Sequence, residues 1–229
     1  MGGALVCSEM AGSAGQDADH VPTLAREGEH WACGALCVAG VDEVGRGAWA
    51  GPIVAAVVVL PADPAIAGDL RGVRDSKAVP PPERARLAAL IRECALATTV
   101  GTAPAALVDR AGVLLATAHA MNEALSSLER APDHVLVDGL YVRGLVCPQT
   151  PIVRGDACCL SIAAASIVAK VTRDRWMAEL DTIYPGYGFA GHKGYGTPAH
   201  RAALCRLGPC PVHRLSYAPV AAIVAQSWV

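Results

Sequence analysis

Acidic side chains end three separate apolar segments of this sequence. They are the adjacent pair Asp42 and Glu43, then Asp138, and finally Asp156. Four carboxylates gathered in one pocket would repel one another and resist ionising together, and bound divalent cations would remove that conflict. Ligands that are all oxygen atoms favour Mg²⁺ or Mn²⁺ over zinc. Two such ions, roughly 4 Å apart, can activate a water and stabilise the leaving oxygen in phosphodiester hydrolysis, which is the chemistry these residues predict.

The stretch 36–60 positions the first two acids. Its apolar runs 38–41 and 52–60 are short and rich in β-branched residues, so we expect two buried strands joined by a tight connection. An acid at the end of a core strand is costly to bury unless a cation meets it there. An isolated Asp-Glu pair is equally typical of a solvated hairpin turn, so the recurrence at two further strand ends favours a site.

Further elements alternate along the chain. We expect helices over 83–94, 109–128, 161–180 and 199–207, and strands over 97–103, 133–139 and 151–154. Strands of a mixed sheet can bring their ends to one place. Acids that lie far apart in the sequence can therefore converge.

Composition indicates one globular domain. The 229 residues are 53% hydrophobic and 17% charged, and no apolar run approaches the length of a membrane span. Residues 1–35 are acidic and lack clear periodicity, so we expect a disordered leader there and a catalytic domain over 36–229. There is no basic start followed by an apolar stretch, and none of the nine cysteines forms a C-x-x-C pair, which favours reduced thiols in a cytoplasm.

Charge is distributed unevenly along the chain. The net charge is −2, yet the segment 154–214 holds eight basic residues against four acidic ones. Such a local excess suits a surface that faces a polyanion, although on charge alone ordinary solvated arginines are the better explanation.

Seven colinear segments carry a family resemblance. They are VAGVDEVGRGAWAGPIVAAVV, RDSK, AMNEAL, DHVLVDG, RGDACCLSIAAASIVAKVTRDRWM, YPGYGFAGHKGYGTPAH and HRLSYAPV. In this order they resemble bacterial ribonuclease HII, a type 2 ribonuclease H, over about residues 36–220. The resemblance implies a ribonuclease H-like α/β fold: a central mixed five-stranded sheet flanked by helices, with a C-terminal helical extension.

The resemblance also implies roles for individual residues. The four carboxylates would be both catalytic and metal-binding, for Mg²⁺ or Mn²⁺. The loop Gly45-Arg46-Gly47 would sense a ribose 2′-hydroxyl, because glycines let the backbone approach a sugar closely. Tyr195 would pack on the neighbouring deoxyribose. Contacts to phosphate are expected from Ser76, Lys77, Lys170 and Arg173.

The implied function is that of an endoribonuclease. It would hydrolyse the RNA strand of RNA/DNA hybrids and cleave 5′ to ribonucleotides embedded in duplex DNA, leaving a 3′-hydroxyl and a 5′-phosphate. Ribonucleotide and RNA primer removal would follow from this activity. We expect a monomer without membrane contact. A sliding clamp is a candidate partner, although the tail shows no convincing clamp-binding peptide.

Some features depart from the family pattern or favour alternatives. Arg154 stands where lysine is commoner, and the three prolines 80–82 put the contacts of Ser76 and Lys77 in question. A zinc site is an alternative use of His200, Cys205, Cys210 and His213, whose spacings are loose for one. A non-catalytic nucleic-acid-binding protein and a DNA endonuclease of the junction-resolving or integrase type are the rival functions. Arg46 and the short leader disfavour the sister family ribonuclease HIII.

Overall fold

A mixed five-stranded sheet forms the centre of the computed structural model, which describes residues 21–139 and 141–226. In the order β3-β2-β1-β4-β5, its strands are β3 (Ala97–Ala103), β2 (Ile53–Val59), β1 (Val38–Val44), β4 (His134–Asp138) and β5 (Gln149–Ile152). β2 is antiparallel to both of its neighbours, whereas β1, β4 and β5 are parallel. The sheet therefore has the mixed, five-stranded form expected from the sequence.

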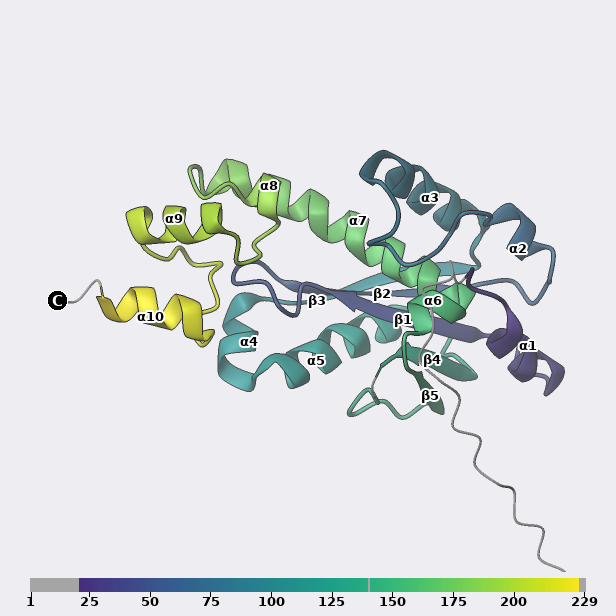
Figure 1. Cartoon of the computed structure of the whole chain (residues 1–229). Helices are drawn as coiled ribbons and strands as arrows, with labels where there is room; N and C mark the ends of the chain where they lie inside the picture. Colours follow the sequence, from purple (N-terminus) through teal and green to yellow (C-terminus); the bar gives the residue numbers. More distant parts are fainter. Residues whose placement is uncertain (1–20, 140, 227–229) are drawn as a thin grey trace, which may run out of the picture.

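Helices cover both faces of this sheet (Figure 1). α3 (Pro81–Cys94) and α7 (Leu160–Ile183) pack on one face, and α4 (Ala105–Ala111) and α5 (Val113–Ser126) pack on the other. Every residue of β2 is buried, which explains its continuous apolar sequence IVAAVVV. A separate hydrophobic core lies on each side of the sheet.

Close contact between β1 and the start of α7 depends on Gly40. A Cβ atom built at Gly40 would lie only 2.3 Å from the carbonyl carbon of Ser161. Any larger residue would push the helix away from the strand. The contact brings the buried first turns of α7 against the strand that carries Asp42.

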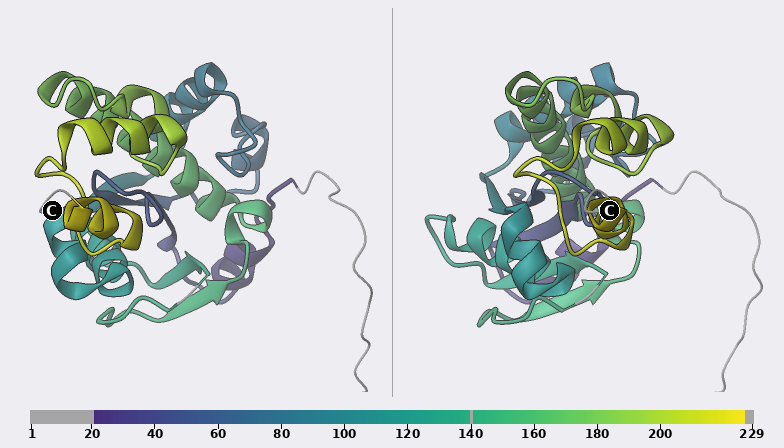
Figure 2. Two further views of the ribbon diagram at one scale, coloured as in Figure 1. Left: turned by 60° about the vertical axis from the view of Figure 1, so that its left-hand side comes forward. Right: turned by 90° about the vertical axis from the view of Figure 1, so that its left-hand side faces the viewer.

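The C-terminal helices gather at one end of the sheet (Figure 2). They are α8 (Phe189–His192), α9 (Pro198–Leu207) and α10 (Ala218–Gln226), and the short helices α2 (Ile66–Asp69) and α6 (Gly155–Cys158) complete the fold. The expected C-terminal helical extension is present. Within the described ranges, no helix has the length and apolar character needed to cross a membrane.

Two predicted elements differ from those observed. The single helix expected over 109–128 is divided at Gly112, whose φ of +81° ends α4 and starts α5. The strand expected over 151–154 lies at 149–152, and Arg154 instead adopts a left-handed conformation with φ 55°. Both breaks depend on single backbone positions that hydrophobic periodicity does not reveal.

The disorder expected over residues 1–35 is wrong for residues 21–35, while residues 1–20 lie outside the described residues. α1 (Ala25–Ala32) forms here, and its Glu27 is fully buried. The carboxylate Oε1 of Glu27 accepts a hydrogen bond of 2.7 Å from the backbone N–H of Ser161. This N–H belongs to the first turn of α7, where free donors and the helix dipole favour an anion. One of the acids that suggested a solvated leader, Glu27, instead caps the start of α7.

Replacing Glu27 by alanine is expected to lower the free energy of unfolding by about 2 kcal/mol, because a charged hydrogen bond at a buried helix start is lost. Urea denaturation measures the change. Glu29→Ala is the matched control, because Glu29 lies on the same helix but is exposed and paired only with Arg26. Equal stability of the two variants would contradict the capping role.

Candidate active site

The ends of the parallel strands bring the predicted acids to one edge of the sheet. Val41 of β1 pairs with Val137 of β4, so Asp42 and Asp138 follow at neighbouring positions. β5 lies beside β4 and leads through a short turn into α6, which carries Asp156. The convergence expected from the recurring pattern of strand followed by acid is therefore present in the fold.

All four acids line one cavity of about 400 Å³, called the carboxylate cavity below. Its other lining residues come from β1, the loop before α3, the middle of α7 and the loop before α9. The full lining is Asp42, Glu43, Val44, Ser76, Lys77, Asp138, Asp156, Ser166, Lys170 and Tyr195. Four further residues predicted from the sequence thus line this cavity together with the carboxylates: Ser76, Lys77, Lys170 and Tyr195.

Burial and mutual repulsion make this cavity unfavourable for negative charge. Burial, followed by repulsion from Glu43 and Asp138, raises the pKa of Asp42 well above its usual value. Burial also raises the pKa of Glu43, although Arg46 opposes the shift, and the pKa of Asp156 rises through burial and the nearby Asp138. The acids are held together by the fold in spite of their charges, which is the condition under which a cation is favoured.

Several carboxylate oxygens are engaged with protein donors in this conformation. Asp42 Oδ1 accepts from the Glu43 N–H at 2.7 Å, and Asp138 Oδ1 accepts from the Gly155 N–H at 2.7 Å. Glu43 Oε1 pairs with Arg46 Nη1 at 3.1 Å. As the side chains stand, no three His, Cys, Asp or Glu residues of the described ranges are arranged to hold one metal ion. The donor types suit a hard cation.

Cationic groups also line the carboxylate cavity. Burial lowers the pKa of Lys77, but Asp75 and the cavity carboxylates outweigh it and raise the value overall. Lys170 Nζ donates to Asp174 at 2.7 Å, and Ser76 accepts from the Ser166 hydroxyl at 3.0 Å. The Lys77 side chain is 83% exposed and its Nζ lies 4.0 Å from Asp75 Oδ1, whereas Lys170 is largely buried and held in a shorter ion pair.

Arg173 does not face the cavity, so its predicted contact to phosphate is wrong. Its side chain is fully buried, and it donates to the carbonyls of Pro52 and Lys193 at 2.9 Å and of Ala50 at 3.1 Å. The guanidinium also lies 5.4 Å from the centre of the Tyr195 ring. Burial lowers its pKa to about 10. Arg173 therefore ties the segment after the Gly45-Arg46-Gly47 loop to the loop that carries Tyr195.

A second buried arginine, Arg214, anchors the backbone of the Gly45-Arg46-Gly47 loop and of the segment after it. Arg214 Nη1 donates to the Arg46 carbonyl at 2.8 Å, and Nη2 donates to the Gly51 carbonyl at 2.9 Å. Tyr217 also donates its hydroxyl to the Arg46 carbonyl. The glycine loop is thus held through its backbone, which leaves the Arg46 side chain 44% exposed and beside Glu43.

The histidine and cysteine cluster is a hydrogen-bonded packing unit. His200 Nε2 and His213 Nε2 are 3.1 Å apart, His200 Nδ1 lies 3.0 Å from the Tyr195 carbonyl, and His213 Nδ1 accepts from the Cys210 N–H. Burial and the adjacent His200 lower the pKa of His213 to about 4, so the pair is neutral at pH 7. Cys205 is exposed on α9. Since each ring nitrogen already has a protein partner, the zinc alternative is not supported.

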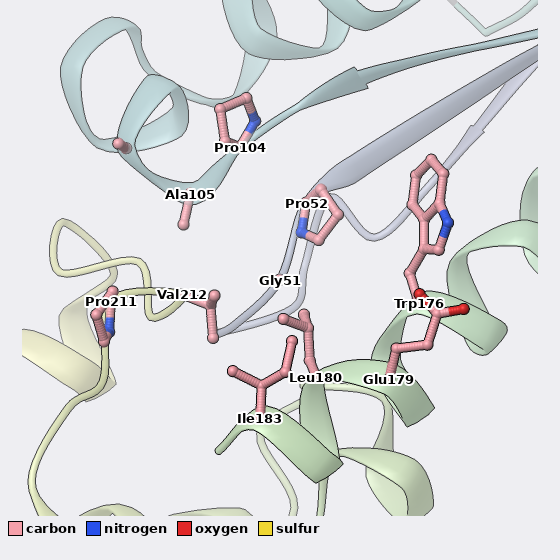
Figure 3. Close-up of a pocket in the computed structure, with 11 residues that line it drawn as sticks. Gly51, Pro52, Pro104, Ala105, Trp176, Glu179, Leu180, Ile183, Pro211 and Val212 are labelled. Atoms are coloured by element: carbon pink, nitrogen blue, oxygen red, sulfur yellow. The ribbon is translucent and has the colours of Figure 1, made fainter.

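An apolar groove lies elsewhere on the molecule (Figure 3). Its volume is about 360 Å³, and Leu180 and Ile183 of α7 line it opposite Pro104 and Val212. None of the four cavity carboxylates contributes to it. A groove of this composition lacks the groups that hydrolysis of a phosphodiester needs.

The family model for ribonuclease HII matches residues 39–220. This chain belongs to the ribonuclease HII family. Ribonuclease HII of Geobacter metallireducens is 53% identical over 188 residues, covering 82% of this chain and 86% of that protein. Ribonuclease HII of Synechococcus sp. is 51% identical over 212 residues, covering 92% and 94%. At this level of identity, the family gives the chain ribonuclease H activity: it is an endonuclease that acts on RNA/DNA hybrids.

Solved structures share the fold. Ribonuclease H2 from Pyrococcus horikoshii OT3 has a TM-score of 0.71 at 28% identity, covering 83% of this chain and 98% of that one. Ribonuclease HII of Archaeoglobus fulgidus, solved in a complex with PCNA, has a TM-score of 0.68 at 26% identity, covering 80% and 95%. Bst-RNase HIII, solved with Mn²⁺, has a TM-score of 0.67 at 21% identity, covering 94% and 77%. The ribonuclease H-like fold expected from the sequence is confirmed.

Sequence reasoning missed three residues around the site. Ser166 lines the carboxylate cavity, Arg214 holds the glycine loop, and the buried Arg84 donates to the Ser76 carbonyl at 2.8 Å. Arg214 lies in the ribonuclease HII segment HRLSYAPV, so its position was visible although its burial was not. Arg84 lies in α3, shortly after the three prolines. A charged residue in a helix is ordinarily exposed, so the sequence did not indicate that Arg84 is buried.

Proposed function

We propose that this chain hydrolyses phosphodiesters by two-metal catalysis. It would cleave 5′ to ribonucleotides embedded in duplex DNA as well as within the RNA strand of hybrids, and it would leave a 3′-hydroxyl and a 5′-phosphate. The observation that carries the proposal is the single cavity lined by Asp42, Glu43, Asp138 and Asp156. This activity would serve ribonucleotide removal and RNA primer removal.

The four carboxylates are the proposed ligands for Mg²⁺ or Mn²⁺. Their oxygen-only donor set fits hard cations, and their burial and mutual repulsion support cation binding. When bound, a pair of such ions supplies an activated water and stabilises the leaving oxygen. The parallel strands hold Asp42 and Asp138 at fixed neighbouring positions, which pre-organises half of the donor set.

The Gly45-Arg46-Gly47 loop is the proposed reader of the ribose 2′-hydroxyl. The buried Arg214 anchors the backbone of the loop, and Arg173 anchors the adjoining segment. These contacts support the proposal, because discrimination between sugars requires groups that are held in fixed positions. Tyr195 lines the carboxylate cavity, and its ring is proposed to pack on the adjacent deoxyribose. Lys77, Ser76 and Lys170 are the proposed contacts on the phosphate side.

The deciding experiment is cleavage of a DNA duplex that contains one ribonucleotide, with Mg²⁺ or Mn²⁺ added and with both product ends mapped. Cleavage on the 5′ side of the ribonucleotide that requires the added ion is expected. An all-DNA duplex of the same sequence is the control, and its cleavage would favour the DNA endonuclease alternative. Binding without cleavage under all ion conditions would favour the non-catalytic alternative.

Changing Tyr195 to alanine is expected to slow cleavage at a single embedded ribonucleotide about tenfold, because stacking on an aromatic ring contributes roughly 1–3 kcal/mol. Single-turnover rates on the same duplex measure the effect. Tyr195→Phe is the matched variant, since it keeps the ring, and it should retain most of the activity. Unchanged turnover in the alanine variant would remove the assigned role.

A sliding clamp remains a proposed partner, because the Archaeoglobus fulgidus relative was solved in a complex with PCNA. A pulldown with the clamp tests the association. The eight cysteines within the described residues are all free thiols, which is consistent with the proposed cytoplasmic location. The monomeric state also stays a prediction, and light scattering in solution tests it.

A further inference from the structure

A smaller cavity adjoins the carboxylate cavity. Its volume is about 160 Å³, and it shares Glu43 and Asp138 with the larger one. Its other wall includes Tyr141 and Arg143, from the connection between β4 and β5. A nucleic-acid strand that lies across the carboxylates would therefore also reach this side cavity.

The backbone at Val142 and Arg143 is held by hydrogen bonds that do not involve the side chains of Tyr141 and Arg143. Val142 is buried, its N–H donates to Gln149 Oε1 at 2.7 Å, and its carbonyl accepts from Gln149 Nε2 at 3.0 Å. The Arg143 carbonyl accepts from Asn122 Nδ2 at 2.8 Å. These hydrogen bonds hold the backbone at Val142 and Arg143, from which and beside which the two side chains project.

The exposure of these side chains is unusual for their chemistry. Tyr141 is 66% exposed, although burying an aromatic ring is favourable, and Leu114 across the side cavity is 58% exposed. Two guanidinium groups, those of Arg46 and Arg143, also line it. An aromatic ring, apolar surface and two cations together match a nucleotide, whose base or sugar stacks while its phosphate binds arginine.

We propose that the side cavity is a subsite for a nucleotide that flanks the cleavage position. Tyr141 packs on the base or sugar of that nucleotide, and Arg143 contacts its phosphate. The inference rests on the proposed function, because it takes the substrate strand to lie across the four carboxylates. It extends substrate recognition beyond the glycine loop and Tyr195, to the connection between β4 and β5.

The test measures duplex binding by Tyr141→Ala and Arg143→Ala without divalent ions, by fluorescence anisotropy. A long duplex with a central ribonucleotide is compared with duplexes shortened up to the ribonucleotide on its 5′ side or on its 3′ side. Each variant is expected to bind the long duplex about tenfold more weakly than the wild type. Arg143→Ala should also reduce the slope of log Kd against log salt by about one. One of the two shortened duplexes lacks the nucleotide that the side cavity binds. On that duplex, the variants should bind as tightly as the wild type.

Arg71→Ala is the matched control, because Arg71 is an exposed arginine just after α2 (Figure 1) and lines neither the side cavity nor the carboxylate cavity. Variants that bind the long duplex as tightly as this control would overturn the subsite. An equal loss of binding on all three duplexes would also overturn the subsite, because neither residue would then contact a flanking nucleotide. Cleavage by the wild-type protein is measured in parallel. Its absence would reject the proposed function, whereas the binding comparison would still decide the subsite.

Discussion

Replacing Asp42 by asparagine is expected to reduce cleavage at an embedded ribonucleotide by at least about a thousandfold. The change removes the most buried of the four carboxylates, and the stabilisation that a bound cation supplies amounts to several kcal/mol, at a factor of ten per 1.4 kcal/mol. Single-turnover rates with saturating Mg²⁺ or Mn²⁺ measure the loss. Retention of full activity would remove the mechanism.

The fold of the Asp42→Asn variant should survive. An amide oxygen can still accept the hydrogen bond from the Glu43 N–H, and a neutral group relieves the repulsion from Glu43 and Asp138. Without divalent ions at pH 7, the free energy of unfolding should therefore equal or exceed that of the wild type. A large loss of stability would mean that the lost activity reports unfolding, and the catalytic interpretation would then lack support.

Replacing Gly45 by alanine is expected to lower cleavage by about a hundredfold and to destabilise the protein. Gly45 has a φ of +93°, and a Cβ atom there would lie 2.3 Å from Arg173 Nε. The left-handed conformation alone costs roughly 1–2 kcal/mol. Arg173 would have to move from the carbonyls that it binds, and small displacements near a reacting group can cost a hundredfold in rate.

The same loop offers a matched stability control. A Cβ atom at Gly47 would have no neighbour within 4 Å, so Gly47→Ala should leave the free energy of unfolding unchanged. Gly68→Ala, at an equally open position of α2, is the control for activity. If Gly45→Ala were as stable and as active as these two controls, the close contact with Arg173 would not position the loop.

The convergence of the acids was predictable because it follows from sheet geometry. Apolar runs that end in Asp42 and Asp138 can be read directly from the sequence, and parallel pairing of their strands places both at one edge. The identity of the glycine loop and of Tyr195 came from the colinear segments, since single-residue roles leave no periodic signal. Tyr195 lines the carboxylate cavity and Arg46 of the loop pairs with Glu43 beside it, while the roles of both toward a sugar stay predictions.

Burial of charged residues was not predictable in the same way. Arg173 precedes two charged residues, Asp174 and Arg175, on a helix, which is typical of a solvated face, but its carbonyl partners belong to Ala50, Pro52 and Lys193. Glu27 likewise lies in an acidic segment and meets Ser161, which is 134 positions away. In both residues, the decisive partner is a backbone group that only the tertiary fold supplies.

The sheet order also has a consequence for synthesis on the ribosome. β1 forms a hairpin with β2 early, but its parallel neighbour β4 emerges roughly 90 residues later, after several seconds of translation. Until then one edge of an apolar strand stays unpaired, so the nascent chain is exposed to aggregation and to chaperones. The same delay keeps Asp42 apart from Asp138 and Asp156, so an unfinished polypeptide cannot assemble the carboxylate cavity.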